Sequence, residues 1–209
     1  MKQYDRGQKM KKKIVIFLIM ILVIVLSYFY AHIDKNSYLY DRNVDTKEFY
    51  STGIISDKEG LIQTFVADED AIDGVYIKIS FVGEVGDVIL HYTLTDDETE
   101  EAISASIKAS DLDDNKFNHL KLPRIEGTKG KTYTLTLSTE NVDEQNGIAF
   151  YVAPGKQTEQ NLVVKGNEVD GTIVARMLCQ RFDVETFVVL LGIVVFVTGF
   201  MKVLYKFFK

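Results

Sequence analysis

The chain has 209 residues with 24 basic and 30 acidic side chains, which gives a formal net charge of −6. This length leaves room for one ordinary domain besides any membrane segments. The charges are segregated: residues 32–183 hold 28 acidic and 15 basic side chains, a net charge of −13. Such an acidic region argues against nucleic-acid binding, which needs a positive surface. Cys179 is the single cysteine, so an internal disulfide is excluded as well.

Residues 14–31 are eighteen consecutive uncharged residues that come directly after three lysines. As a helix they would extend about 27 Å, close to the hydrocarbon thickness of a bilayer. A cleaved signal peptide would have a shorter apolar core and small residues at its end. Here Tyr28, Phe29 and Tyr30 occupy that place. We therefore predict an uncleaved signal anchor over residues 14–31, with residues 1–13 as a basic cytoplasmic tail.

The segment 32–60 is mixed in composition and is expected to be a juxtamembrane linker that leads into a first strand near residues 49–55. Its tyrosines Tyr38 and Tyr40 have two equally supported interpretations. They could sit in the aromatic belt at the membrane interface, where tyrosine is enriched. The alternative is that they belong to a plain linker.

Apolar and polar residues then alternate with a period of two. In residues 75–81, valine, isoleucine and phenylalanine alternate with tyrosine, lysine and serine, and the pattern recurs in 90–95, 103–108 and 132–138. Such alternation is typical of strands with one face on a core and one in water. Shorter strands are expected at 61–66, 117–122, 148–152, 161–165 and 172–178, with turn-forming residues between them. About eight short strands predict an antiparallel two-sheet sandwich over residues 61–183.

A second apolar run, residues 186–201, lies between Glu185 and Lys202. A helix of this length falls slightly short of a bilayer, so a buried core helix is the competing interpretation. Because Lys202 can extend its charge to the interface, and further lysines come after it, we predict a second transmembrane helix over residues 184–205. The basic tail 206–209 would be cytoplasmic, like the N-terminus, with the acidic domain outside.

Four segments carry a resemblance to a known fold: residues 61–67, 72–77, 94–96 and 130–138. Their order resembles jelly-roll modules of the galactose-binding or carbohydrate-binding type, found as ectodomains of bacterial membrane proteins linked to surface glycans. The resemblance implies an all-β jelly roll flanked by the two transmembrane helices. It also implies sugar stacking on aromatic rings, often tryptophan, which this chain lacks. Tyr76 and Tyr151 are possible substitutes, although tyrosine is also simply favoured in strands.

Residues typical of catalysis or metal binding form no recognised motif. His32, His91 and His119 are isolated histidines, and we assign no catalytic residue. Residues 111–115 begin like a calcium loop, but Lys116 and Leu122 replace the glycine and glutamate that the loop requires. The acidic clusters 68–70 and 96–98 are expected to be solvated turns. We predict no metal and no cofactor.

These observations favour a non-enzymatic binding or scaffolding module in cell-surface glycan assembly or envelope organisation. The expected partners are the bilayer, a membrane protein of glycan assembly and a surface polysaccharide. The alternative is a surface glycan hydrolase with an unrecognised carboxylate site. The charge of −13 predicts poor binding to anionic polymers unless divalent cations bridge them. Cys179 is expected to be a free thiol near the membrane, the alternative being a disulfide between two chains.

Overall fold

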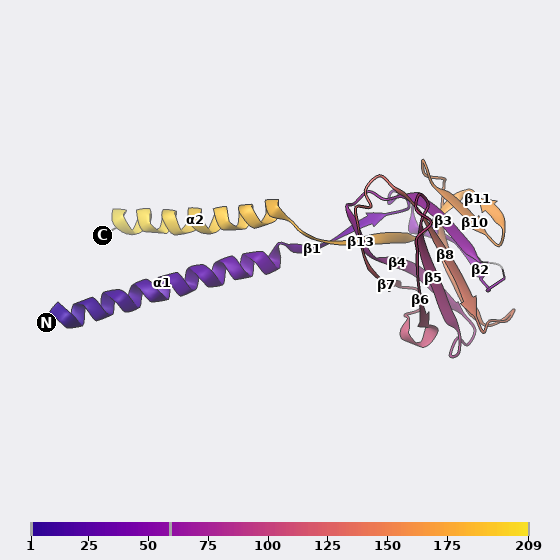
Figure 1. Cartoon of the computed structure of the whole chain (residues 1–209), viewed down its shortest axis with the longest axis horizontal. Coiled ribbons are helices and arrows are strands. Elements are labelled where there is room, and N and C mark those ends of the chain that lie inside the picture. The colour runs from indigo at the N-terminus through magenta and orange to yellow at the C-terminus, as the bar shows by residue number, and fades with distance from the viewer. Residues whose placement is uncertain (1, 59, 209) are drawn as a thin grey trace. The chain divides into compact units, whose positions relative to one another are not determined.

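The structure is a computed structural model that describes residues 2–58 and 60–208, with side chains for residue 11 and from residue 13 onward. The chain forms two compact units. One is the domain Lys35–Gln180, and the other comprises the two terminal segments. Figure 1 shows the helices α1 and α2 of the terminal segments and the strands of the domain.

The terminal segments contain α1 (Lys2–Tyr30) and α2 (Val184–Phe207). Each contains a stretch, Lys13–Tyr30 and Val184–Phe207, that is long and apolar enough to cross a membrane by length and composition. Their large apolar side chains are mostly exposed, which is consistent with insertion in a membrane. The Asp183 carboxylate caps α2 by accepting hydrogen bonds from the backbone N–H groups of Glu185 and Thr186.

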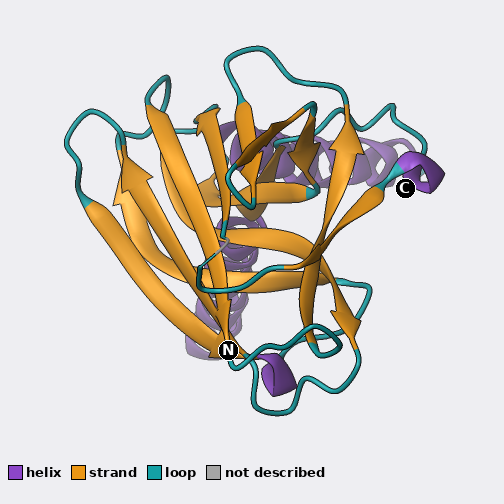
Figure 2. Ribbon diagram, turned by 90° about the vertical axis from the view of Figure 1, so that its right-hand side faces the viewer, coloured by secondary structure: helices purple, strands orange, loops and turns teal. Residues whose placement is uncertain are grey.

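The domain is a sandwich of two antiparallel sheets (Figure 2). The seven-stranded sheet has the order β1 (His32–Tyr38), β13 (Ala175–Phe182), β4 (Ala71–Val82), β9 (Gly147–Pro154) and β12 (Gly171–Ile173), with β7 (Phe117–Glu126) paired to β4 and β2 (Tyr50–Ile54) paired to β9. The six-stranded sheet has the order β11 (Asn167–Val169), β10 (Asn161–Val164), β3 (Leu61–Val66), β8 (Thr132–Glu140), β5 (Ile89–Asp96) and β6 (Ala102–Lys108). Two short 3-10 turns, Thr46–Glu48 and Ala109–Asp111, complete the domain.

The chain passes repeatedly from one sheet to the other, as in a jelly roll. β3 lies in the six-stranded sheet, β4 in the seven-stranded sheet, and β5 and β6 in the six-stranded sheet again. β7, β8, β9 and β10 then alternate between the two sheets. The predicted fold class, a two-sheet jelly-roll sandwich with a long apolar helix at each end of the chain, is confirmed.

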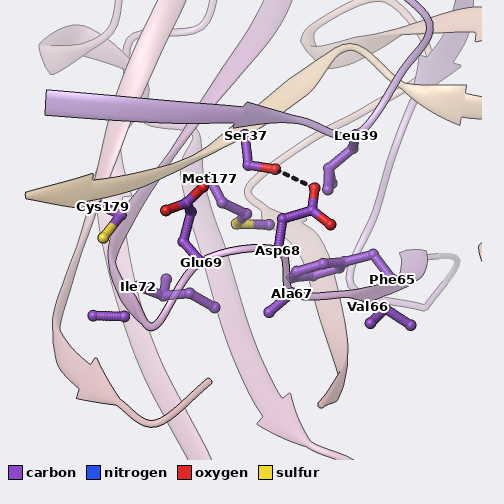
Figure 3. Close-up of a pocket in the computed structure, with 11 residues that line it drawn as sticks. Ser37, Leu39, Phe65, Val66, Ala67, Asp68, Glu69, Ile72, Met177 and Cys179 are labelled. Atoms are coloured by element: carbon purple, nitrogen blue, oxygen red, sulfur yellow. Dashed lines mark hydrogen bonds between the residues drawn. The ribbon is translucent and has the colours of Figure 1, made fainter. Parts of the chain in front are cut away.

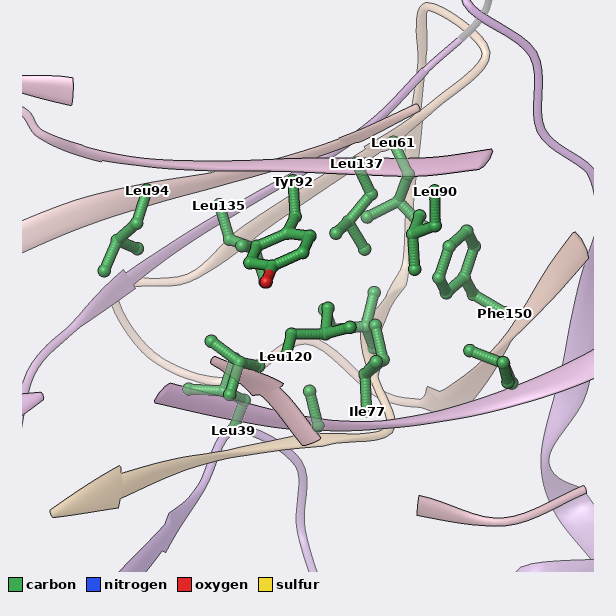
Figure 4. Packing of buried hydrophobic residues seen from close by; sticks show 14 of the residues in the cluster. Leu39, Leu61, Ile77, Leu90, Tyr92, Leu94, Leu120, Leu135, Leu137 and Phe150 are labelled. Atoms are coloured by element: carbon green, nitrogen blue, oxygen red, sulfur yellow. The ribbon is translucent and has the colours of Figure 1, made fainter. Parts of the chain in front are cut away.

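The core lies between the sheets and is built by the alternating positions of the strands. Figure 4 shows side chains from both sheets meeting there: Leu61, Leu90, Tyr92, Leu94, Leu135 and Leu137 from the six-stranded sheet, and Leu39, Ile77, Leu120 and Phe150 from the other side. Each fully buried leucine, isoleucine or phenylalanine contributes about 1.5–3 kcal/mol. The Tyr92 hydroxyl donates to the Lys121 carbonyl at 2.9 Å, so its burial leaves no polar group unsatisfied.

The segment 32–60 contains the expected first strand near residues 49–55, as β2, but it begins with another strand where a linker was expected. Strand β1 joins β13, and the buried Leu39 belongs to the core. Tyr38 is the last residue of strand β1. Neither of the two interpretations of this tyrosine, in an interfacial belt or in a plain linker, included such a strand. Leu39 is buried, and its N–H donates to the Ala175 carbonyl at 3.0 Å, so this part of the chain is joined to the domain.

The expected strand at 172–178 is divided into β12 and β13 at Val174. Ile173 pairs with Val152 of β9, whereas Ala175 pairs with Ile77 of β4. The chain thus changes its neighbouring strand within two residues. A continuous apolar pattern cannot reveal such a change, because both halves bury the same kind of side chain.

Candidate ligand-binding face

The outer face of the seven-stranded sheet carries aromatic rings and cations. Val75 and Ile77 of β4 point into the core, so Tyr76 between them points outward. The registers of β13, β4 and β7 place Arg176 opposite Tyr76, and Tyr76 opposite His119. We define the aromatic face as the set of Tyr38, Arg42, Tyr76, Lys78, Phe117, His119, Tyr151 and Arg176.

Tyr76 and His119 form its centre. Their rings stack with centroids 4.6 Å apart and an interplanar angle of 18°. The backbone beneath the stack is Gly74, whose φ of +157° is a conformation that L side chains rarely adopt. A Cβ atom on Gly74 would lie 2.5 Å from the Nε2 atom of His119. Glycine at position 74 therefore makes the position of the imidazole ring possible.

Arg176 lies against three rings. Its Cζ atom is 4.7 Å from the ring centroid of Tyr76 and 4.9 Å from that of Phe117. Its Nη1 atom donates to the hydroxyl of Tyr38 at 3.3 Å. Cations within about 6 Å of a ring centroid are attracted by the ring quadrupole, by about 0.5–2 kcal/mol for each contact. The rings therefore fix a half-buried guanidinium at this point of the sheet.

Lys78 and Arg42 repeat this arrangement. The Nζ atom of Lys78 is 4.6 Å from the ring centroid of Tyr151, whose hydroxyl donates to the side chain of Asn115. The Cζ atom of Arg42 is 4.5 Å from the ring centroid of Tyr38. Within the described part of the chain, all the cation–π contacts lie on the aromatic face.

Tyr40 and Phe49 extend the aromatic face beyond Tyr38. The rings of Tyr38 and Tyr40 meet edge to face at 5.7 Å, and those of Tyr40 and Phe49 at 5.6 Å. Burial raises the pKa of the Tyr40 phenol, and the nearby phenol of Tyr38 adds to this effect. The phenol therefore remains a neutral hydrogen-bonding group at physiological pH.

The outer face of the six-stranded sheet is different in chemistry. Register brings threonine and serine side chains together on β3, β8, β5 and β6. We define the hydroxyl face as the set of Thr64, Thr93, Thr95, Ser104, Ser106, Thr134, Thr136 and Ser138. Its members bond to one another, as in the 2.8 Å contact of the hydroxyls of Thr93 and Ser104. Of the two outer faces, the aromatic face is therefore the one on which cations lie against rings.

A small cavity lies beside β1 and β13 (Figure 3). Its volume of about 10 Å³ matches a single water molecule at most. Ser37 donates to the Asp68 carboxylate at 2.7 Å, and Lys35 pairs with Glu69 at 2.6 Å. These contacts tie the acidic cluster 68–70 to β1. The cavity is too small for a sugar or a cofactor.

The other acidic clusters also serve the fold. Asp96 accepts hydrogen bonds from the backbone N–H groups of Glu98 and Thr99 and thereby closes the turn between β5 and β6. In the segment 111–115, the Asp114 carboxylate accepts from the backbone N–H of Phe81. Among the described residues, no group of three or more histidine, cysteine, aspartate or glutamate side chains is arranged to hold a metal ion.

The histidines are not brought together. His32 belongs to the terminal segments, where its Nδ1 atom lies 2.8 Å from the Tyr28 carbonyl. His91 lies among the hydroxyl face, with its Nε2 atom 3.1 Å from the Glu140 carboxylate. His119 lies on the aromatic face.

Cys179 is buried, and no residue of this chain is bonded to its sulfur. Burial raises the pKa of the thiol, and the nearby carboxylates of Glu69 and Asp73 raise it further. Nucleophilic cysteines instead have a lowered pKa, commonly through an adjacent histidine or lysine. The environment of Cys179 is therefore that of a packing residue.

Sequence reasoning singled out Tyr76 and Tyr151, and the structure places both on the aromatic face. It considered His119 only as a possible catalytic base and missed Arg176 and Phe117 altogether. The position of Phe117, two residues before His119 on one strand, was a usable signal because such residues share a face. For Arg176, the pairing of β13 with β4 had to be known first.

Comparison with known proteins identifies no relative by sequence: neither a family model nor a curated protein matches. Solved structures show a distant likeness. A clostridial cysteine protease after propeptide cleavage is 8% identical with a TM-score of 0.39, covering 65% of this chain and 41% of its own. The xylan-binding module CBM15 is 8% identical with a TM-score of 0.34, and the match covers 72% of this chain and 99% of that module. The VP2 subviral particle of infectious bursal disease virus is 14% identical with a TM-score of 0.27, and the match covers 70% of this chain and 40% of the viral chain. This chain therefore spans about two fifths of the protease, and these likenesses carry no argument about function.

Proposed function

We propose that the protein is a membrane-anchored, non-enzymatic module that binds cell-surface glycan through its aromatic face. The observation that carries the proposal is the gathering of half-buried rings and hydrogen-bonding side chains on one outer face of the sandwich. Sugar rings have apolar C–H faces and polar edges. A surface that binds them therefore needs flat apolar groups with polar groups beside them.

The aromatic face supplies both kinds of group. Tyr151 of β9 offers ring surface. On the neighbouring strands β4 and β7, the stacked rings of Tyr76 and His119 form a second flat group. Lys78 and the amide of Asn115 lie at the Tyr151 ring and can bond to sugar hydroxyls. Because the rings are held by stacking and by cations, they would lose little conformational entropy when a ligand binds.

The proposed topology places this face outside the cell. Basic residues flank both apolar helices, and short basic flanks mark the cytoplasmic side of spanning helices. Residues 14–31 and 184–205 would span the bilayer, with the termini inside and residues 61–183 outside. The acidic domain would then be held near the membrane from both of its ends. Such a position suits a module in glycan assembly or envelope organisation, acting beside a membrane protein of that assembly.

Binding is tested with the full chain in nanodiscs and the polysaccharide extracted from the surface of the cells that encode it. We expect binding that weakens in Tyr76→Ala and in Tyr151→Ala by roughly 2- to 13-fold each, the equivalent of one aromatic contact. Thr136→Ala, on the hydroxyl face, is the matched control and should bind like the wild type. Thermal melts confirm that each variant is folded.

Two results would contradict the proposal. Unchanged affinity in both tyrosine variants would move the site away from the aromatic face. Release of new reducing ends from the polysaccharide, abolished by changing one carboxylate, would identify a glycan hydrolase instead.

A further inference from the structure

We propose that the glycan bound at the aromatic face is acidic, and that an anionic group on it, a carboxylate or a phosphate, binds to Arg176. This inference rests on the proposed function and specifies its ligand. Three observations support it: Arg176 has unused hydrogen-bond donors, the cations near it form no ion pairs among the described residues, and a guanidinium is planar.

The protein leaves the guanidinium of Arg176 incompletely satisfied. A guanidinium has five N–H donors. Among the described residues, the guanidinium of Arg176 makes a single hydrogen bond, from Nη1 to the hydroxyl of Tyr38. Its buried Nε atom has no acceptor there. Buried polar groups nearly always have partners, and an exception calls for an explanation such as a ligand.

Charge is also left unpaired there. The ion pairs of the described residues involve Lys35, Lys116, Arg124 and Lys131, together with His91, but none of the cations of the aromatic face. Arg124 on β7 shows the contrasting case, because it is 2.8 Å from Asp73 and 3.1 Å from Glu126. Although residues 32–183 include 28 acidic side chains, no described carboxylate forms an ion pair with Arg42, Lys78 or Arg176.

The geometry suits an oxyanion. Rings at 4.7 and 4.9 Å hold the guanidinium of Arg176 and exclude water from part of it, which strengthens its interaction with a charge. A planar guanidinium can donate two parallel hydrogen bonds to a carboxylate or phosphate. Lys78 is a diagonal neighbour of Arg176 across β4 and β13, about 7–8 Å away between Cα atoms. It provides a second positive charge for the same polymer.

The net charge of the domain does not oppose this binding. Charges separated by more than about 8 Å are largely screened at physiological ionic strength. Local contact with Arg176 and Lys78 therefore outweighs the distant carboxylates that give the total of −13. The expectation from composition alone, that anionic polymers are avoided, is thereby reversed for this one face.

The test uses the full chain in nanodiscs and three preparations of the same cell-surface polysaccharide: native, carboxyl-reduced and dephosphorylated. We expect affinity for the native polymer to exceed that for one of the treated polymers by roughly 10- to 150-fold, the equivalent of a hydrogen bond to a charged group. The treatment that lowers the affinity identifies the anion as carboxylate or phosphate.

Variants then assign the effect to Arg176. Arg176→Met, which keeps an apolar stem over the rings, should lose most of the preference for the native polymer and retain only the smaller contribution of Lys78. Arg176→Lys keeps the positive charge but cannot donate two parallel hydrogen bonds. Its preference for the native polymer should therefore lie between those of Arg176→Met and the wild type. Lys129→Met removes one positive charge from an exposed position and should leave the preference unchanged. Melting temperatures show whether each variant is folded. The comparison of the three polysaccharide preparations on the wild type needs no variant and is independent of this control.

The outcomes separate the two proposals. Equal affinity of the wild type for all three preparations overturns the acidic ligand and leaves glycan binding intact. A preference for the native polymer that is as large in Arg176→Met as in the wild type overturns the role of Arg176. Failure of all three preparations to bind overturns the proposed function and the anion site together.

Discussion

The substitution Gly74→Ala tests the geometry under the aromatic face. The φ of Gly74 is +157°, in a region that is essentially restricted to glycine. A new Cβ atom would lie 2.5 Å from the Nε2 atom of His119 and 2.9 Å from the carbonyl oxygen of Leu120. The imidazole could move, but the oxygen belongs to the backbone of β7, which pairs with β4. We expect a loss of about 1–3 kcal/mol in the free energy of unfolding from backbone strain.

Thermal unfolding of the full chain in nanodiscs, monitored by near-ultraviolet circular dichroism, measures this loss. The expected decrease in Tm is roughly 2–12 °C for a chain of this size. Gly86→Ala is the matched control, because no atom lies within 4 Å of its Cβ position. That variant should melt at the wild-type temperature or slightly higher, since alanine reduces the entropy of the unfolded chain. A Tm of Gly74→Ala within about 1 °C of that of Gly86→Ala would refute the described contacts of β4 with β7.

Three further expectations concern the thiol, the pH dependence of stability and the topology. The buried Cys179 should react slowly with alkylating reagents until the domain unfolds, and a reductant-sensitive dimer that is lost in Cys179→Ser would contradict a free thiol. Burial opposes ionisation of Asp96, but bonds from the N–H groups of Glu98 and Thr99 outweigh it and lower the pKa of the carboxyl. Its contribution to stability is therefore present above the unfolded pKa of about 3.9 and is lost as the pH falls further, so Asp96→Asn should flatten the decline in Tm below about pH 4. Reporter fusions after residues 13 and 209 should be cytoplasmic and one after residue 127 exported, and an exported reporter at either terminus would refute the topology.

Much of the fold could be predicted because it depends on local patterns. Alternation identified the four longest predicted strands, and the shorter candidate Leu61–Val66 has the predicted bounds. Strand β1 was missed because its sequence, HIDKNSY, has little apolar alternation. Its position depends on neighbouring residues instead, above all on the burial of Leu39 and on the hydrogen bond from the N–H of Leu39 to the Ala175 carbonyl at 3.0 Å.

The candidate site was less predictable because it depends on register. Tyr76 could be assigned to an outward position from β4 alone, but its neighbours come from β13 and β7, about 100 and 40 residues later in the chain. Arg176 lies in an apolar run whose alternation does not tell which strand it joins. The net charge averages over residues 32–183 and therefore cannot indicate that Arg42, Lys78 and Arg176 lie together on one face.

Glycan binding at the aromatic face is tested most directly by hydrogen–deuterium exchange of the full chain in nanodiscs, with and without the native surface polysaccharide. We predict slower exchange in β4, β7 and β13, which carry Tyr76, His119 and Arg176, and unchanged exchange in β5 and β8 beneath the hydroxyl face. Exchange slows where a bound ligand suppresses local opening of the backbone. Protection confined to β5 and β8, or no protection in any strand at a saturating polysaccharide concentration, would contradict binding at this face.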